Sequence, residues 1–375
     1  MLYLAYREGF RYTAVFGLVF TLGCSDEEQR YDSLDGSSDL SLNHQFTITD
    51  SDDTMLSHIA TVHVTSDGHI LLPDYQQGHI HEFDQQGNLL NTFIESGSGP
   101  GEIDDFGGVI LTPDDELGIY DFGNRRISYY ERTGSDWEFQ YSTVVEENLR
   151  WFYPAGDSWI INKMSGRMDP EKDSIQVDRL SIDGDLVEEG ALEFKADQGI
   201  FIEDENGMVF LSMSPPFLAV SHIEFADDYF VYAYTDDLSF TFYDLGSLEP
   251  TDSFSVNLPP VPLSEETRQE YLHEQADLAM PSGVDAESQI SDQLPDEKTV
   301  MKYFTYDLKQ EKIWAQVYYK DETPWLVLDR SGSLLYKTHL DYDDYDLRMV
   351  HDGRIYVGDE DDRGLPMLKV YEYEQ

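Results

Sequence analysis

The chain has 375 residues, of which 40% are hydrophobic and 13% aromatic, so it carries enough apolar material for a packed globular core. It has 75 acidic but only 24 basic residues, which gives a formal net charge of −51. This balance excludes nucleic acid as an expected partner and argues against electrostatic binding to anionic membranes, because both require clustered basic side chains.

The acidic residues are spread along the chain, with runs at 50–54, 341–346 and 359–362. We interpret them mainly as a solvated, self-repelling surface. None of the runs has the ligand spacing of an EF-hand calcium loop. Calcium therefore stays an alternative, and no cofactor is predicted.

Residues 1–23 have the pattern of a secretion signal. Arg7 and Arg11 flank the start of an apolar run, 12–22, that is too short to span a bilayer. Cys24 follows this run and is the only cysteine, so no intramolecular disulfide can form. Residues 24–41 are mostly polar and predict a flexible tether between the signal and the folded domain.

The segment Leu22-Gly23-Cys24 resembles the end of a bacterial lipobox, although Thr21 stands where that motif usually has leucine. The resemblance implies that Cys24 is acylated and anchors an outer-membrane or cell-surface lipoprotein. The acidic segment 25–28 is similar to the surface-export signals of some Bacteroidetes lipoproteins. The alternative is an ordinary signal peptide, a lone thiol and a soluble periplasmic protein.

From residue 42 to residue 375 the apolar runs are short, rich in β-branched and aromatic residues, and bounded by Asp, Gly, Asn or Pro, which predicts strands. They fall into six groups. The predicted strands are 58–65, 69–73, 79–84 and 88–94; 107–112, 117–121, 126–131 and 136–144; 149–154, 158–163, 175–182 and 185–193; 218–224, 229–234, 238–243 and 251–256; 299–306, 312–318, 324–329 and 333–339; and 346–350, 354–358 and 366–373.

A turn marker supports this register: an apolar residue, an acidic residue, two further residues and glycine recur between the third and fourth strands, with shortened versions in two of the five groups. Its glycines are Gly87, Gly134, Gly184, Gly246 and Gly332. The acid can accept a backbone hydrogen bond that starts the turn, and glycine can adopt the positive φ that ends it.

Six groups of about four strands predict an all-β, six-bladed propeller. The last group lacks a fourth strand, whereas residues 42–48 form a strand candidate without a group of its own. We therefore expect this N-terminal strand to complete the last blade and close the ring, which would remove exposed sheet edges.

The stretch 97–134 resembles an NHL-type repeat through Gly-Pro-Gly-Glu, Tyr120-Asp121 and Asn124-Arg125-Arg126-Ile127. The whole region 42–375 is similar to TolB-like propellers, many of which are exported lipoproteins. The glycine-rich loop of this stretch is no phosphate-binding loop, because it lacks the Lys-Ser/Thr pair and leads into a strand.

The repeat is interrupted between the fourth and fifth groups by an insertion, 257–298. Ser264 is a suitable N-cap, acidic residues follow it, and Pro281 would stop a helix predicted at about 265–279. The insertion is either an ordinary surface excursion or a cap over one mouth of the central channel.

Candidate binding residues lie just after second strands, at Asp74, Asp121 and Asp359. They either cap the following loop or line a channel mouth, where Arg125 and Arg126 would help to hold a polar ligand. His79 and His81 share one side of a strand, and His69 could lie near them. We interpret these histidines as a polar stripe, with a metal site as the alternative.

These features favour a binding module over an enzyme, since no nucleophile elbow and no zinc pattern occurs in the sequence. The expected partner is an envelope protein, a glycan or a small polar ligand, bound by a monomer that meets the membrane only through its lipid. The alternative, implied by the resemblance to propeller lactonases and lyases, is a calcium-dependent enzyme with its site at the channel mouth. No complete set of the family's calcium ligands can be assigned to this sequence.

Overall fold

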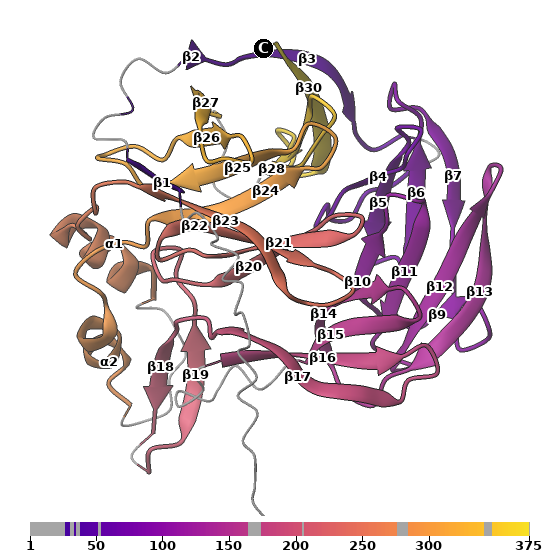
Figure 1. Cartoon of the computed structure of the whole chain (residues 1–375), viewed down its shortest axis with the longest axis horizontal. Coiled ribbons are helices and arrows are strands. Elements are labelled where there is room, and N and C mark those ends of the chain that lie inside the picture. Colours follow the sequence, from indigo (N-terminus) through magenta and orange to yellow (C-terminus); the bar gives the residue numbers. More distant parts are fainter. Residues whose placement is uncertain are drawn as a thin grey trace, which may run out of the picture.

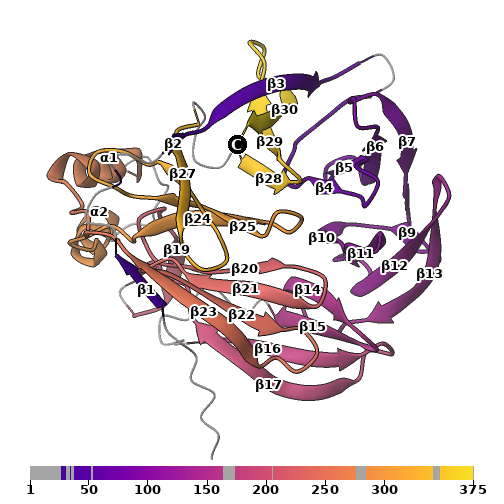
Figure 2. The ribbon, with the colours of Figure 1, turned by 45° about the horizontal axis from the view of Figure 1, so that its top comes forward.

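The computed structural model describes residues 27–30, 34, 38–51, 54–163, 174–204, 206–275, 284–340 and 347–374. Within these ranges, consecutive antiparallel strands form six blades around a central axis, as Figures 1 and 2 show. The fold is therefore an all-β, six-bladed propeller, and the predicted fold class is confirmed.

The predicted strand groups correspond to the blades, with strand ends that differ by a few residues. Blade one contains β4 (His63–Val64), β5 (Ile70–Asp74), β6 (His79–Phe83) and β7 (Leu89–Phe93). Blade two contains β10 (Phe106–Leu111), β11 (Glu116–Asp121), β12 (Arg126–Thr133) and β13 (Asp136–Val144). Blade three contains β14 (Leu149–Ala155), β15 (Ser158–Lys163), β16 (Ser174–Ser181) and β17 (Leu186–Lys195).

The second half of the ring follows the same order. Blade four contains β20 (Ser221–Phe225), β21 (Tyr229–Tyr234), β22 (Leu238–Asp244) and β23 (Pro250–Asn257). Blade five contains β24 (Met301–Asp307), β25 (Lys312–Val317), β26 (Trp325–Leu328) and β27 (Leu334–Thr338). Blade six contains β28 (Leu347–His351), β29 (Arg354–Glu360), β30 (Pro366–Glu374) and the N-terminal β3 (Ser41–Ile48).

Strand β3 closes the ring as expected. It pairs antiparallel with β30, with His44 opposite Tyr371 and Ile48 opposite Leu368. Ile48 and Leu368 are buried and belong to a cluster that also holds Ile70 of blade one. The closing strand thus gives blade six its outer edge and packs it against blade one.

Buried side chains join each blade to the next. Six apolar clusters each combine residues of two neighbouring blades; representative pairs are Ile80 and Ile119, Ile127 and Ile161, Ile160 and Phe230, Phe240 and Phe304, Val327 and Ile355, and Val370 and Ile70. Because every blade shares a core with both neighbours, burial of apolar area stabilises the ring as one unit.

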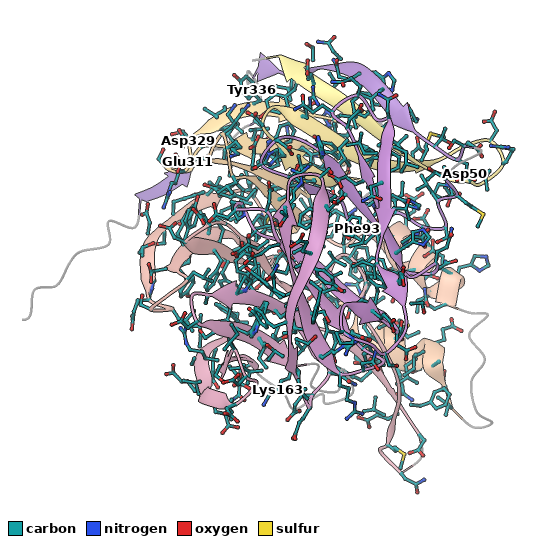
Figure 3. The ribbon with its side chains drawn as sticks, turned by 90° about the vertical axis from the view of Figure 1, so that its right-hand side faces the viewer. Asp50, Phe93, Lys163, Glu311, Asp329 and Tyr336 are labelled. Atoms are coloured by element: carbon teal, nitrogen blue, oxygen red, sulfur yellow. The ribbon has the colours of Figure 1, made fainter. Side chains whose placement is uncertain are left out.

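The marker turns form largely as predicted. Gly87, Gly134, Gly184 and Gly332 have φ between 69° and 92°, but in blade four Leu248 takes the positive φ (59°) in place of Gly246. In blade five the Asp329 carboxylate accepts the backbone N–H groups of the turn, including that of Ser331 at 2.9 Å. Figure 3 shows Asp329 beside Glu311, on the surface where Arg330 pairs with Glu311 at 3.0 Å.

The described part of 24–41 is not a free tether, which corrects that prediction. Strand β1 (Glu27–Arg30) pairs in parallel with the outer edge of β23, and β2 (Ser38–Asp39) pairs with β27. Leu34, between them, is only 2% exposed and packs in the cluster shared by blades four and five. The backbone N–H and C=O groups at the outer edges of β23 and β27, together with the buried side chain of Leu34, therefore hold this polar segment against the ring.

Two excursions interrupt the ring. Between blades three and four lies a hairpin, β18 (Ile200–Glu203) and β19 (Val209–Met213), which the sequence analysis missed. Between blades four and five lie α1 (Glu265–Gln275) and α2 (Ala286–Gln293), whereas one helix at 265–279 was expected. Residue Pro281, the proposed helix stop, lies outside the described residues.

Hairpin and helices form a separate apolar cluster, in which Ile202, Phe217 and Ile290 are buried. Gln289 and Gln293 of α2 hydrogen-bond the backbone of β18. Figures 1 and 2 show the four elements at the periphery of the ring. No helix in the described ranges is long and apolar enough to cross a membrane.

Candidate functional site

Asp74 caps the turn between β5 and β6 and does not face the channel. It is 2% exposed and accepts hydrogen bonds from the backbone N–H groups of Ser57 (3.0 Å), Gln76 (3.1 Å) and Gln77 (2.9 Å). Burial raises its pKa, but these bonds and the Ser57 hydroxyl outweigh burial, so the pKa lies below its ordinary value.

Asp121 has the same place in blade two and is completely buried. It accepts the backbone N–H (3.1 Å) and side-chain amide (2.7 Å) of Asn124, and lies 3.4 Å from Nε of Arg126. The Arg126 guanidinium also donates to the carbonyls of Gly99 (2.9 Å) and Glu102 (2.7 Å). These two residues therefore fasten the glycine-rich loop to blade two.

Arg125 and Asp359 lie apart from this group. Arg125 is exposed and donates to the Glu146 carbonyl at 3.3 Å. Burial raises the pKa of Asp359, but the ion pair with Lys369 outweighs burial and leaves the pKa below its ordinary value. None of the five residues predicted for a ligand site lines either of the two hollows of the channel described below, and their hydrogen bonds and ion pairs are those expected of residues that cap loops.

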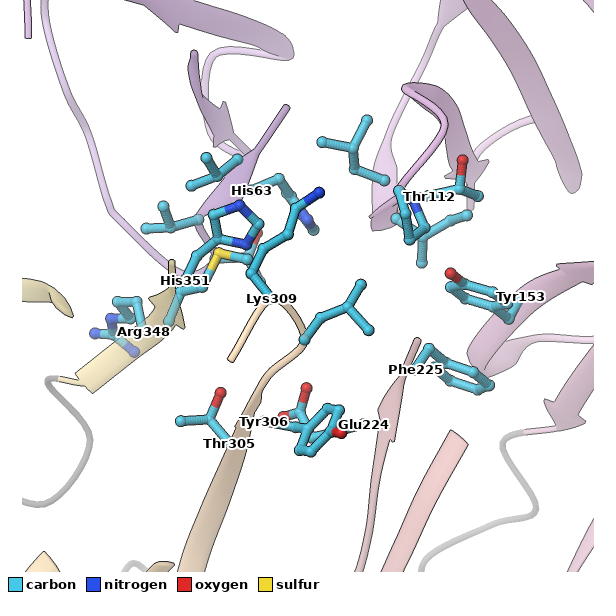
Figure 4. A pocket seen from close by; sticks show the side chains of 18 of the residues that line it. His63, Thr112, Tyr153, Glu224, Phe225, Thr305, Tyr306, Lys309, Arg348 and His351 are labelled. Atoms are coloured by element: carbon cyan, nitrogen blue, oxygen red, sulfur yellow. The ribbon is translucent and has the colours of Figure 1, made fainter. Parts of the chain in front are cut away.

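Two hollows lie in the central channel, among the described residues. The first strand of each blade lies nearest the central axis and is called its inner strand. A cavity of about 450 Å³ is lined by residues of all six inner strands and of the segments next to them (Figure 4). A second hollow, also of about 450 Å³, shares Thr61, Ile110 and Glu224 with it, so the two adjoin each other. Volumes of this size are typical of small-molecule sites.

One wall of the cavity is aromatic. Tyr153 of blade three and Phe225 of blade four stack with ring centroids 4.2 Å apart and an interplanar angle of 4°. The Tyr153 hydroxyl donates to the Ala226 carbonyl at 2.8 Å, which fixes the ring. These rings offer a flat apolar surface to a ligand.

The opposite wall is polar and basic. It carries His63 of blade one, Lys309 of blade five, and Arg348 and His351 of blade six, which Figure 4 shows across the cavity from Tyr153 and Phe225. Among the described residues, Nε2 of His63 and Nε of Arg348 are buried without a hydrogen-bond partner. Two unsatisfied nitrogens in one cavity favour a ligand with hydrogen-bond acceptors.

Both histidines are uncharged near neutral pH. Burial lowers the pKa of His63 to about 4. Burial also lowers the pKa of His351, and Lys309 adds to this effect while Asp307 and Asp352 oppose it. The fixed positive charges of this wall are therefore those of Lys309 and Arg348.

Among the described residues that line this cavity, Glu224 alone is a carboxylate, and its side chain lies 3.1 Å from Nε2 of His222. Calcium normally takes six to eight oxygen ligands, several of them carboxylates. One carboxylate beside an arginine and a lysine does not fit that ion. The described cavity residues therefore do not supply a calcium site.

The insertion 257–298 lines neither hollow of the channel in its described part. The basic wall was not predicted from the sequence, because the candidate binding residues were sought in the loops after the second strands of the blades. The available signal was a polar residue within an inner strand, such as His63 or Arg348, where the neighbouring residues are apolar.

Solved structures support the fold. The chain is similar to a protein of Bacteroides fragilis NCTC 9343 that is provisionally named as exported, with 14% identity and a TM-score of 0.54 over 93% of this chain and 99% of that chain. It is also similar to a member of the DUF4221 family from Bacteroides vulgatus ATCC 8482, with 9% identity and a TM-score of 0.50 over 90% and 99%. No protein-family model matches the sequence, and no curated protein matches it either.

Proposed function

We propose that this propeller is a binding module whose central cavity takes a small molecule with an aromatic or apolar part and an anionic group. The observation that carries the proposal is the polarised cavity, with a stacked aromatic pair facing Arg348 and Lys309. In a chain of net charge −51, a cavity lining with two fixed cations and one carboxylate favours an anion.

The site favours a small ligand over the envelope protein or glycan that the sequence also allowed. A protein partner would need a broad surface, whereas the unpartnered nitrogens of His63 and Arg348 belong to residues that line an enclosed cavity. A calcium-dependent hydrolase or lyase is less well supported, because one carboxylate cannot make the usual oxygen cage.

We further propose an exported lipoprotein of the NHL or TolB-like type. The signal pattern of 1–23 and the Leu22-Gly23-Cys24 segment support the anchor, and Cys24 lies outside the described residues. The likeness to a protein named as exported is consistent with it. The Asp121, Asn124 and Arg126 bonds support the repeat type. Processing in the native host should be blocked by globomycin and abolished by Cys24→Ala, and globomycin-insensitive processing would contradict the anchor.

Binding is tested with matched acids and amides by calorimetry, using indole-3-acetate and indole-3-acetamide, and 4-hydroxybenzoate and its amide. We expect the acids to bind more tightly, and Arg348→Gln to weaken acid binding roughly 10- to 100-fold, as expected for the loss of a charge-assisted hydrogen bond. Arg363→Gln is the control, because Arg363 is exposed and pairs with Asp361 outside the cavity. Equal affinity for acid and amide, or an equal loss in both variants, would contradict the proposal.

A further inference from the structure

Asp74, His79 and His81 bring three metal-binding side chains together at one end of blade one. One ligand atom of each residue lies within 4.8 Å of the other two. Nε2 of His79 and Nε2 of His81 are 3.1 Å apart, with the rings nearly perpendicular. Two nitrogens bound to one zinc ion at about 2.0–2.1 Å lie roughly 3.3 Å apart in tetrahedral geometry.

The sheet fixes this arrangement. Asp74 is the last residue of β5 and pairs with His79, the first residue of β6. His81 follows two positions later and therefore points to the same side of the sheet as His79. The three side chains meet because of backbone register and not because of a mobile loop.

Neighbouring residues orient the His81 ring and the Asp74 carboxylate through hydrogen bonds. Nδ1 of His81 is 2.9 Å from the Thr92 hydroxyl, which leaves Nε2 facing His79. The Asp74 carboxylate is oriented by Ser57 and by the turn backbone. Such outer contacts orient ligating histidines and carboxylates in metal proteins.

Blade two shows what normally balances this carboxylate. There Asp121, Arg126 and Ser128 have the positions of Asp74, His79 and His81, and the guanidinium lies 3.4 Å from the aspartate. In the described chain, the 2%-exposed Asp74 has no arginine or lysine within ion-pair distance. A buried carboxylate normally has a cationic partner or binds a metal.

We propose that Asp74, His79 and His81 bind Zn²⁺ or a similar late first-row divalent cation. Two imidazoles and one carboxylate suit these ions and are poor ligands for calcium or magnesium. His79 is partly exposed, so an ion can enter from solvent and water can complete its coordination. None of the three residues lines the central cavity, so this site is separate from the proposed ligand site. His69 is not part of it, because His69 lies 2.7 Å from Glu82.

The test uses full-length mature protein without a histidine tag, stripped with EDTA and titrated with ZnCl₂ by calorimetry and with CoCl₂ by visible absorption. We expect one high-affinity ion per chain, a tetrahedral-type cobalt spectrum, and at least a 10-fold loss of affinity in His79→Gln and His81→Gln. His44→Gln is the matched control, since His44 lies in β3 and contacts Thr47.

Thermal unfolding of the stripped proteins shows whether the variants fold. His79→Gln is the decisive variant, because its side chain is the more exposed of the two imidazoles. Zinc should raise the melting temperature of the wild type and of His44→Gln but not of a folded His79→Gln. Unchanged affinity in His79→Gln, or no stoichiometric binding by the wild type, would overturn the proposal.

Discussion

His63 lies in the cavity wall as a neutral imidazole, and this has a consequence for stability. Its pKa is about 4 in the folded protein, below the ordinary value of 6.5. Between these values the unfolded chain binds more protons, so stability falls as the pH is lowered from 6.5 to 4. At about 1.4 kcal/mol per pKa unit, the full loss is roughly 3 kcal/mol.

His63→Asn removes this titration and keeps a polar side chain. Urea unfolding at pH 7, 5.5 and 4 should show the wild type losing about 3 kcal/mol more than the variant over this range. The wild type and the variant have the same acidic surface, so its contribution to the pH dependence of stability cancels in the difference between them. Parallel pH profiles would show that His63 is not a buried neutral group.

Single residues also show how far the sequence predicts the site. Asp74 and Asp121 were recognised as special because each ends a second strand, and the structure gives both a buried capping role. Their sequence position could not distinguish a cap from a ligand, since both uses need a carboxylate at a strand end. The basic wall was not predicted, because His63 and Arg348 come together only when blades one and six close.

Among the elements, β3 has the largest expected effect on stability. Removing residues 1–49 would expose the edge of β30 and the apolar contacts of Ile48 and Leu368. We expect this variant to lose cooperative thermal unfolding or to aggregate. A variant lacking residues 1–37 loses β1 and Leu34 but keeps β3, and should remain folded with a lower melting temperature.

Calorimetry and light scattering of these two truncations measure the outcome. If both variants unfold at the same temperature as the intact chain, β3 does not close the ring in solution. If the shorter truncation is as damaging as the longer one, the segment 27–37 contributes more than the structure indicates.

Elements inside the repeat were predicted well and those outside it poorly, for a physical reason. Alternating apolar residues and acid-glycine turns specify the blade strands locally, so β21 was predicted at its observed bounds, 229–234. The hairpin β18–β19 and helix α2 instead depend on each other through the cluster around Ile290. Their stability is tertiary, and neither segment carries a strong pattern of its own.

For the molecule as a whole, the dominant electrostatic term is the net charge of −51. Self-repulsion of this charge opposes compaction, and raising NaCl from 0.1 to 1 M shortens the screening length from about 10 to 3 Å. We expect stability to rise by about 1–2 kcal/mol, which moves the melting temperature by roughly 1–3 °C for a chain of this length. Scanning calorimetry at constant pH measures this, with sucrose as an uncharged control; a melting temperature that falls or stays constant with NaCl would contradict the expectation.

Ring closure through β3 also constrains the order of events during folding. His44 and Tyr371 pair although they come from opposite ends of the described chain, so this contact cannot form until β30 is available. Five blades can assemble from local hairpins, but the sixth has to wait for the last strand to be synthesised. Bringing such distant segments together carries a loop-closure cost and slows folding. The chain is therefore expected to spend its slowest folding phase as an open arc with the β30 edge unpaired.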